Sequence, residues 1–315
     1  MRERRRDPVT GAWTTFANVP PDRRADELGP CPLCRLTDEP FDVLVVEDPL
    51  PPLEPSPPPA MTAAADPYAV AAAVGASELV VHGPDHDATL ASLGAAPLEH
   101  AVHVWADRYA ELGGRPEVGY ALVHAAVGDD AGATLLHPHS RIEAYPEIPP
   151  VPLQELQTAR DHLSATGRCV LCDVLTAERH DPARVVAANE SFLALVPFAA
   201  RFPYEVHVLA QRHAPSLLDL TDVERAALAD LLHRVLAGYD RLFGFPVSYA
   251  LAIHQAPTDD GQWQSVSHFH VELVPPHRAA EELRRPYPPE LAAGAYVNAA
   301  VPERAAAELR AALAA

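Results

Sequence analysis

Two cysteine pairs of identical spacing are the first residues in this sequence that could do chemistry. Cys31 and Cys34 enclose Pro-Leu, and Cys169 and Cys172 enclose Val-Leu. In a cytosolic chain, such pairs favour metal binding or redox chemistry over structural disulfides. A zinc ion takes four soft or borderline ligands in a tetrahedron, and one CxxC turn can supply two thiolates from one side.

Histidines follow each cysteine pair in the same order. A lone histidine comes first, and each half then carries a His-x-His, so the landmarks recur roughly 130 residues later and indicate an internal duplication. A thioredoxin-like redox pair is the alternative for either CxxC, and the histidines argue against it. We therefore predict two structural zinc ions per chain, one on Cys31, Cys34, His86 and His137 and one on Cys169, Cys172, His213 and His268.

The first His-x-His, His137-Pro-His139, could also act on a substrate. Residues two apart on a strand share a face, so a metal could hold one ring while the other faces a ligand. A neutral imidazole attacks phosphorus when a hydrogen bond to its other nitrogen fixes the tautomer. The alternative is that both histidines are zinc ligands or ordinary strand residues, and the spacing alone does not decide between them.

The secondary-structure elements that position these cysteines and histidines can be predicted from short apolar runs, which alternate with helical stretches. The pattern predicts strands over residues 77–82 and 202–209, and a helix over 221–236 with Thr221 as its N-cap. We expect an α+β fold of two halves, residues 1–150 and 151–315, each with an antiparallel sheet and helices. The proline-rich residues 49–59 are predicted to form an exposed linker or flap, and residues 147–152 to join the halves.

Composition restricts the classes of function. The chain has 315 residues, 48% of them apolar, and a net charge of −19, which disfavours a nucleic-acid partner. It contains no run of roughly 20 apolar residues that could cross a bilayer, and its N-terminus lacks the apolar stretch of a secretory signal, so we expect a cytoplasmic protein. There is no lysine, which excludes lysine from catalysis.

Residues 134–146, TLLHPHSRIEAYP, resemble the nucleophile motif of the galactose-1-phosphate uridylyltransferases. Residues 5–13, 31–34, 197–207, 254–257 and 294–298 are similar to further segments of that family, in the family's order. The resemblance implies a duplicated histidine-triad fold, a homodimer, and ping-pong transfer of a nucleoside monophosphate between sugar 1-phosphates. It implies that His139 is the nucleophile and that the first zinc site is as predicted above.

The second metal site varies within the family. Some members use a glutamate and three histidines, for which Glu155, His254, His268 and His270 stand at corresponding positions. Others carry a second CxxC. Because thiolate is the better zinc ligand, we expect the site on Cys169 and Cys172 here, with Glu155, His254 and His270 as neighbours.

The chain departs from the family around the nucleotide. Ser140-Arg141 replaces Gly-Gln, Glu47-Asp48 replaces Asn-Asp, and Ala126 replaces an asparagine. The expected substrate-binding residues are Thr134, Ser140, Arg141, Asp48 and Arg23. The substrates are expected to be a nucleotide-sugar and a sugar 1-phosphate or phosphate. Alternatives are adenylyl transfer like that of ADP-glucose phosphorylase, a nucleotidyltransferase for another sugar phosphate, and a zinc-stabilised nucleotide-binding protein without turnover.

Overall fold

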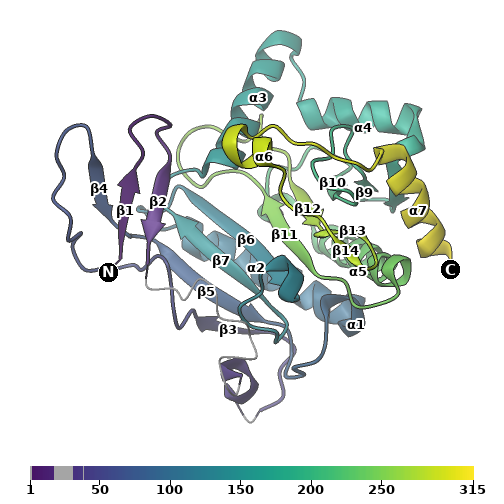
Figure 1. Cartoon of the computed structure of the whole chain (residues 1–315), viewed down its shortest axis with the longest axis horizontal. Helices are drawn as coiled ribbons and strands as arrows, with labels where there is room; N and C mark the ends of the chain where they lie inside the picture. The colour runs from purple at the N-terminus through teal and green to yellow at the C-terminus, as the bar shows by residue number, and fades with distance from the viewer. Residues whose placement is uncertain (1, 18–30, 38) are drawn as a thin grey trace.

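A nine-stranded antiparallel sheet organises the protein, for which a computed structural model describes residues 2–17, 31–37 and 39–315 (Figure 1). Every neighbouring pair of strands in it is antiparallel. The strands lie in the order β3 (Leu44–Glu47), β5 (Ala76–Val81), β7 (His139–Tyr145), β6 (Tyr120–Val127), β11 (Tyr249–His254), β12 (His270–Val274), β10 (Val206–Ala210), β9 (Phe192–Leu195) and β8 (Val185–Ala188).

The pairing of β6 with β11 at the centre of the sheet joins the two parts of the sequence. On one side lie β7, β5 and β3, and on the other β12, β10 and β9, so the same strand order is repeated outward from the centre. The registers also correspond: Val81 pairs with His139, and Leu209 pairs with His270. The two His-x-His motifs therefore occupy equivalent places in one continuous sheet.

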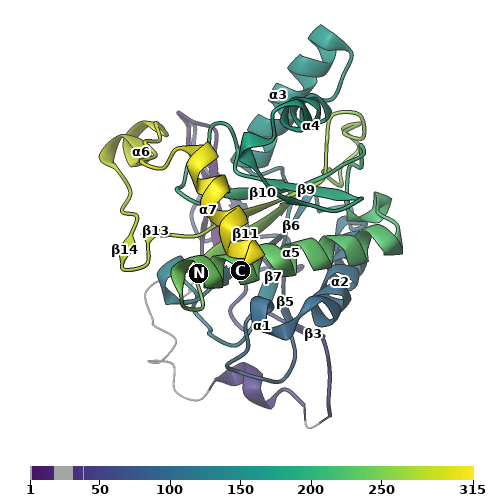
Figure 2. The ribbon, with the colours of Figure 1, turned by 90° about the vertical axis from the view of Figure 1, so that its right-hand side faces the viewer.

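Two long helices cover one face of this sheet. Helix α2 (Ala95–Gly113) packs on β5, β6 and β7, and α5 (Asp222–Phe243) packs on β8 and β9. The helices also pack against each other, as Figure 2 shows. Thr221 caps α5 as predicted, because its hydroxyl accepts from the Glu224 backbone N–H while the Glu224 carboxylate accepts from the Thr221 backbone. The helix continues beyond the predicted end to Phe243.

Shorter elements complete the fold. Helices α3 (Pro150–Thr166) and α4 (Val170–His180) come after β7 in the sequence, and α7 (Pro302–Ala314) packs against α5. Among the described residues, the remaining elements are the small sheet β2 (Trp13–Phe16), β1 (Glu3–Arg6) and β4 (Ala69–Ala72), the hairpin β13 (His277–Ala279) and β14 (Glu282–Leu283), helices α1 (Leu90–Leu93) and α6 (Pro288–Ala293), and the short 3-10 turns Pro32–Arg35, Asp129–Ala131, Pro182–Arg184 and Leu217–Asp219.

Two sequence-based expectations need correction. The proline-rich segment 49–59 is largely exposed, as expected, but it is anchored at its middle, because Leu53 is buried and Glu54 exchanges backbone hydrogen bonds with Ala73 and Gly75. The strand expected over 202–209 begins only at Val206. Before it, the Glu205 carboxylate accepts hydrogen bonds from the backbone N–H of Arg201 and of Phe202, and these bonds hold a turn.

The helix-covered face of the sheet forms the main core. Alternate residues of β7 and β12 point into it, namely Ile142 and Ala144 on one strand and Val271 and Leu273 on the other. Trp105 on α2 is buried there, and its indole N–H donates to the Ser140 hydroxyl at 2.8 Å. No helix of the described residues is long and apolar enough to cross a membrane.

The Trp105–Ser140 hydrogen bond yields a stability prediction. We expect Trp105→Phe to lower the free energy of unfolding by about 2 kcal/mol or more, because it leaves a buried hydroxyl without a partner and opens a small void. Adding Ser140→Ala removes that hydroxyl, so the double variant should lose ~1 kcal/mol less than the sum of the single variants. Urea denaturation of the four proteins measures the coupling, and strict additivity would contradict the proposed contact.

Candidate active site

His139 is the first residue of strand β7, and one of its two ring nitrogens is engaged in a hydrogen bond. Its Nδ1 lies 2.8 Å from the backbone carbonyl oxygen of His137. A carbonyl can only accept, so Nδ1 carries the proton and Nε2 keeps a free lone pair. Burial lowers the pKa of His139 to about 4, which keeps the ring neutral near pH 7. A buried, neutral imidazole with one free nitrogen of fixed tautomer can act as a nucleophile.

The strand directs alternate side chains to opposite sides of the sheet. His139 and Arg141 face away from the core, whereas Ser140 faces α2 and bonds Trp105. A substrate contact from Ser140 would therefore have to come from its backbone. A cavity of about 220 Å³ lies at His139, and Ala126, Pro138 and Val247 are among its lining residues. Thr134 is half-buried in the loop that precedes His137.

Arg141 is held beside His139 by a buried carboxylate. Its Nη1 donates to Asp48, which lies just after β3 and is only 5% exposed. The Arg141 charge lowers the pKa of His139, and the Asp48 charge raises it, so both groups act electrostatically on the ring. The structure therefore brings Arg141 and Asp48 together with His139. Arg23 lies outside the described residues.

The first predicted metal group gathers around His137. Cys34 Sγ lies 3.3 Å from His86 Nδ1 and 3.6 Å from His137 Nδ1, and Cys31 completes the group. Two ligands of one tetrahedral zinc ion, one sulfur and one nitrogen, are roughly 3.6 Å apart. The Nε2–H of His137 donates to the Gly83 carbonyl oxygen at 2.9 Å, which leaves Nδ1 free for a metal. These residues therefore fit a metal ion.

The second predicted group has the same design. His268 Nδ1 lies 3.5 Å from Cys169 Sγ and 3.6 Å from Cys172 Sγ, and His213 Nδ1 lies 4.0 Å from Cys172 Sγ. The Nε2 atoms of His268 and His213 donate to the carbonyl oxygens of Ala210 and Gln264, at 2.8 and 2.9 Å. Cys169 is the N-cap of α4, with Cys172 in the first turn, where the helix dipole favours thiolates. The group could bind a metal ion.

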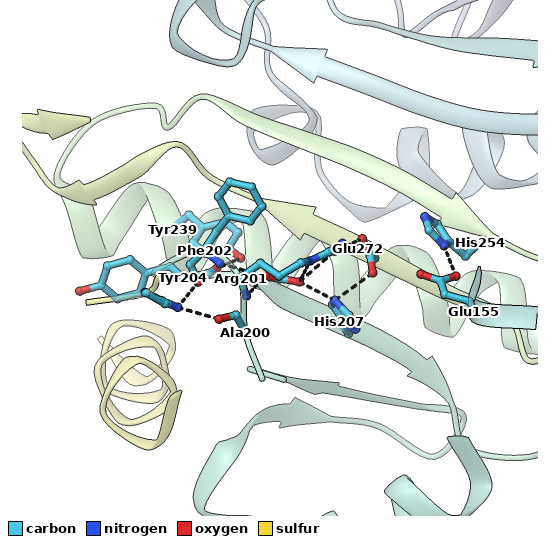
Figure 3. A network of polar contacts seen from close by, with 11 residues as sticks. Glu155, Ala200, Arg201, Phe202, Tyr204, His207, Tyr239, His254 and Glu272 are labelled. Carbon is cyan, nitrogen blue, oxygen red and sulfur yellow. Dashed lines mark hydrogen bonds and ion pairs between the residues drawn. The ribbon is translucent and has the colours of Figure 1, made fainter. Parts of the chain in front are cut away.

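The set of Glu155, His254, His268 and His270 does not gather as one site. His268 lies with the cysteines, while Glu155, His254 and His270 are joined by Glu272, with one ligand atom of each within 4.8 Å of the others. Sequence reasoning missed Glu272, although its alternation with His268 and His270 along one strand was a usable signal. Figure 3 shows His254 bonded to Glu155, and Glu272 beside Arg201 and His207.

The fold and the site define an α+β protein of the duplicated histidine-triad type. The galactose-1-phosphate uridyl transferase N-terminal domain profile matches residues 45–149, and the C-terminal domain profile matches residues 155–313. The chain belongs to the galactose-1-phosphate uridylyltransferase family.

Individual relatives agree with the family profiles. The chain is 34% identical over 315 residues to a galactose-1-phosphate uridylyltransferase of Thermotoga maritima, with 98% of each chain covered. It is 32% identical over 318 residues to the Streptomyces lividans enzyme, with 92% of this chain and 85% of that one covered. A solved uridylyltransferase structure superposes with a TM-score of 0.90 at 31% identity, covering 99% of this chain and 98% of that one.

A fourth comparison supports the fold alone. An ADP-glucose phosphorylase from Arabidopsis thaliana with bound ADP-glucose gives a TM-score of 0.74 at 22% identity, covering 98% of both chains.

Because His137 and His139 have different surroundings, we expect their substitution to have different effects on metal content and stability. His137→Ala should lower both the metal content and the thermal stability, because it removes one of the four residues of the group that could hold a metal. His139→Ala should keep both, because its ring contacts no member of that group except through the backbone. Elemental analysis and thermal denaturation of protein purified without chelator measure the difference. Equal metal loss in the two variants would show that the roles are not divided.

Proposed function

We propose that this chain transfers uridylyl groups between UDP-glucose and galactose 1-phosphate, through a covalent nucleotidyl intermediate on His139. One observation carries the proposal: the buried, neutral His139 ring has its Nδ1–H tied to the His137 carbonyl oxygen and its Nε2 free. The names of the relatives in Thermotoga maritima and Streptomyces lividans support the choice of substrates.

The reaction takes two displacements at phosphorus. In the first, Nε2 of His139 attacks the α-phosphorus, and the bridging P–O bond breaks with its electron pair going to glucose 1-phosphate. In the second, a phosphate oxygen of galactose 1-phosphate attacks the same phosphorus, and the N–P bond returns its electrons to His139. The intermediate carries a positive ring, and the His137 carbonyl oxygen, which accepts from Nδ1–H at 2.8 Å, stabilises that charge.

Arg141 and Asp48 are proposed to bind the transferred phosphate together. The guanidinium offers five N–H donors, and the carboxylate of Asp48 uses only part of them. The buried Asp48 orients the guanidinium at a fixed position two residues beyond His139, on the same side of the strand. Thr134, the Ser140 backbone and Arg23 remain proposed as further substrate contacts.

We propose that zinc occupies both groups of two cysteines and two histidines, two ions per chain. The support is the fit of the sulfur–nitrogen distances and the hydrogen bonds that leave the ligating nitrogens of His137, His213 and His268 free. Four protein ligands leave no open position, so the ions are structural. The first would fix His137, whose backbone carbonyl orients the nucleophile.

The organisation of the chain follows from the repeated strand order. We propose that residues 1–150 and 151–315 are the two duplicated halves, the first with His139 and the first zinc site, the second with the other zinc site. We also propose a cytoplasmic homodimer. The family resemblance supports it, and so do the exposed apolar residues near the C-terminus, Tyr287, Leu291, Val297 and Val301.

A second candidate function is adenylyl transfer, as in ADP-glucose phosphorylase. Ser140 after the His-Pro-His favours it, because this variant of the motif also resembles the ADP-glucose phosphorylase branch. A protein that binds a nucleotide without turnover is the remaining alternative, and the pairing of Arg141 with Asp48 is its best support.

A covalent adduct tests the class and the base together. We expect UDP-glucose, incubated without an acceptor, to add the mass of one uridylyl group to the intact protein, because His139 can attack before any acceptor binds. His139→Gly should abolish the adduct, whereas the control His124→Gly, on the neighbouring strand, should retain it. An adduct only with ADP-glucose would replace uridylyl by adenylyl transfer, and the absence of any adduct would indicate a binding protein.

Arg141 allows a kinetic prediction. We expect Arg141→Gln to slow adduct formation by about 10- to 100-fold, because a charge-assisted contact to phosphate contributes ~1.5–3 kcal/mol. Arg108→Gln is the control, since Arg108 forms a comparable half-buried ion pair with Glu78 outside the cavity. Single-turnover measurement separates formation of the adduct from its decay. Faster decay with unchanged formation would mean that Arg141 over-stabilises the intermediate, and two unchanged rates would place it outside the reaction.

A further inference from the structure

Two loops from opposite parts of the chain close the cavity at His139. One is the loop between β6 and β7, which contributes Gly128 and Leu135 to the cavity wall. The other is the turn between α5 and β11, which contributes Pro246 and Val247. The shape of the cavity therefore depends on how the second part of the chain holds the loop that leads into the proposed nucleophile.

The turn between α5 and β11 is fixed by local contacts. The backbone N–H of Val247 donates to Asp240 Oδ1, near the C-terminal end of α5, at 2.8 Å. Val247 and Ser248 are both buried. Gly128 of the other loop lies directly against this turn, since a Cβ at Gly128 would be only 2.2 Å from Ser248 Oγ. The two loops therefore touch beside the cavity.

The loop between β6 and β7 begins with the 3-10 turn Asp129–Ala131. The backbone N–H groups of Ala131 and Ala133 donate to the Gly128 carbonyl oxygen, at 3.2 and 3.3 Å. These bonds stay within the loop, so they shape the turn but do not fix its position relative to the rest of the protein. That position depends on contacts from outside the loop.

His277 supplies such a contact. It is the first residue of β13 and only 5% exposed, and its Nε2 lies 3.3 Å from Oδ2 of Asp130 in the 3-10 turn. Its ring packs against Phe243 at the end of α5, with ring centroids 5.7 Å apart, and against Phe245 in the following turn, with centroids 5.2 Å apart. One buried side chain therefore touches both loops that close the cavity.

The ring nitrogens of His277 lack a well-aligned partner. Across residues 2–17, 31–37 and 39–315, neither nitrogen has the geometry of a hydrogen bond. Buried polar groups are nearly always bonded, because an unpaired one costs free energy. The Asp130 side chain is 42% exposed, so a small shift of its turn would align the carboxylate with the ring N–H. Hydrogen bonds at enzyme sites often tighten only when the substrate binds.

We propose that His277 is a positioning residue for the His139 cavity and that it acts through Asp130. When part of a nucleotide-sugar enters the cavity, the Asp130 carboxylate accepts a hydrogen bond from His277 Nε2–H and holds Gly128 and Leu135 against the substrate. The inference rests on the proposed function, since it places the substrate in this cavity. It adds that a residue of the second part of the chain controls how tightly the cavity binds.

Packing and hydrogen bonding of His277 can be separated by substitution. His277→Phe keeps an aromatic ring against Phe243 and Phe245 but removes the N–H, and Asp130→Ala removes the acceptor. Each variant should weaken the binding of a nucleotide-sugar about tenfold, as expected for the loss of one hydrogen bond to a charged group. Asp130→Asn keeps an acceptor oxygen and should retain most of the affinity. Asp129→Ala, on the same 3-10 turn, is the control and should leave the affinity unchanged.

Titration calorimetry in the His139→Gly background measures the affinity without a covalent step. UDP-glucose and ADP-glucose are titrated separately, and thermal denaturation checks the fold of each variant. His277→Phe/Asp130→Ala should lose no more affinity than either single variant, because the two groups act as a pair. A purely structural role would lower the melting temperature and leave the affinity unchanged. That result, an equal loss in Asp129→Ala, or additive losses in the double variant would overturn the inference.

This outcome is separable from that of the adduct experiment. If the wild-type protein forms the adduct and the affinities do not change, uridylyl transfer stands and the role of His277 is wrong. If the affinities change as expected and no adduct forms, the positioning role stands and the covalent step is wrong. If neither nucleotide-sugar binds, both proposals fail.

Discussion

Hydrogen bonds from histidine rings to backbone carbonyl oxygens determine the chemistry of this protein. His137, His139, His213, His268 and His270 each commit one nitrogen in this way. Because a carbonyl only accepts, each bond fixes the tautomer and leaves the other nitrogen with a lone pair. The backbone then decides whether that lone pair points at thiols, at carboxylates or into a cavity.

In a His-x-His motif, two histidines only two residues apart direct their free nitrogens to different surroundings. In His137 the bonded nitrogen is Nε2 and Nδ1 faces the cysteines, whereas in His139 the bonded nitrogen is Nδ1 and Nε2 is free. The bond of His139 is to the carbonyl of His137 itself. A metal bound to the first ring would therefore also fix the acceptor that orients the second, so a structural ion would affect the proposed nucleophile without taking part in the reaction.

The duplication places the same backbone around two different charge distributions. At His139 the residue two positions on is Arg141, neutralised in part by Asp48, and at His270 it is Glu272, held by Arg201 and His207. Burial lowers the pKa of both histidines to about 4, so both rings are neutral near pH 7. The neighbours, rather than the histidines, therefore give the two positions opposite local charge.

Spacing alone predicted both cysteine–histidine groups, because a CxxC turn is local and its histidine partners recur in order. The α+β class and the cap of α5 also followed from local patterns. The structure was needed for contacts that depend on which strands are neighbours. Asp48 is far from Arg141 in sequence and meets it through β3, β5 and β7, and Glu155 on α3 reaches His254 on β11. Strand order is set by packing over the whole sheet, so no short segment encodes it. The side of the strand on which Ser140 lies, and the separation of His268 from His270 and Glu272, were decided by the same long-range pairing.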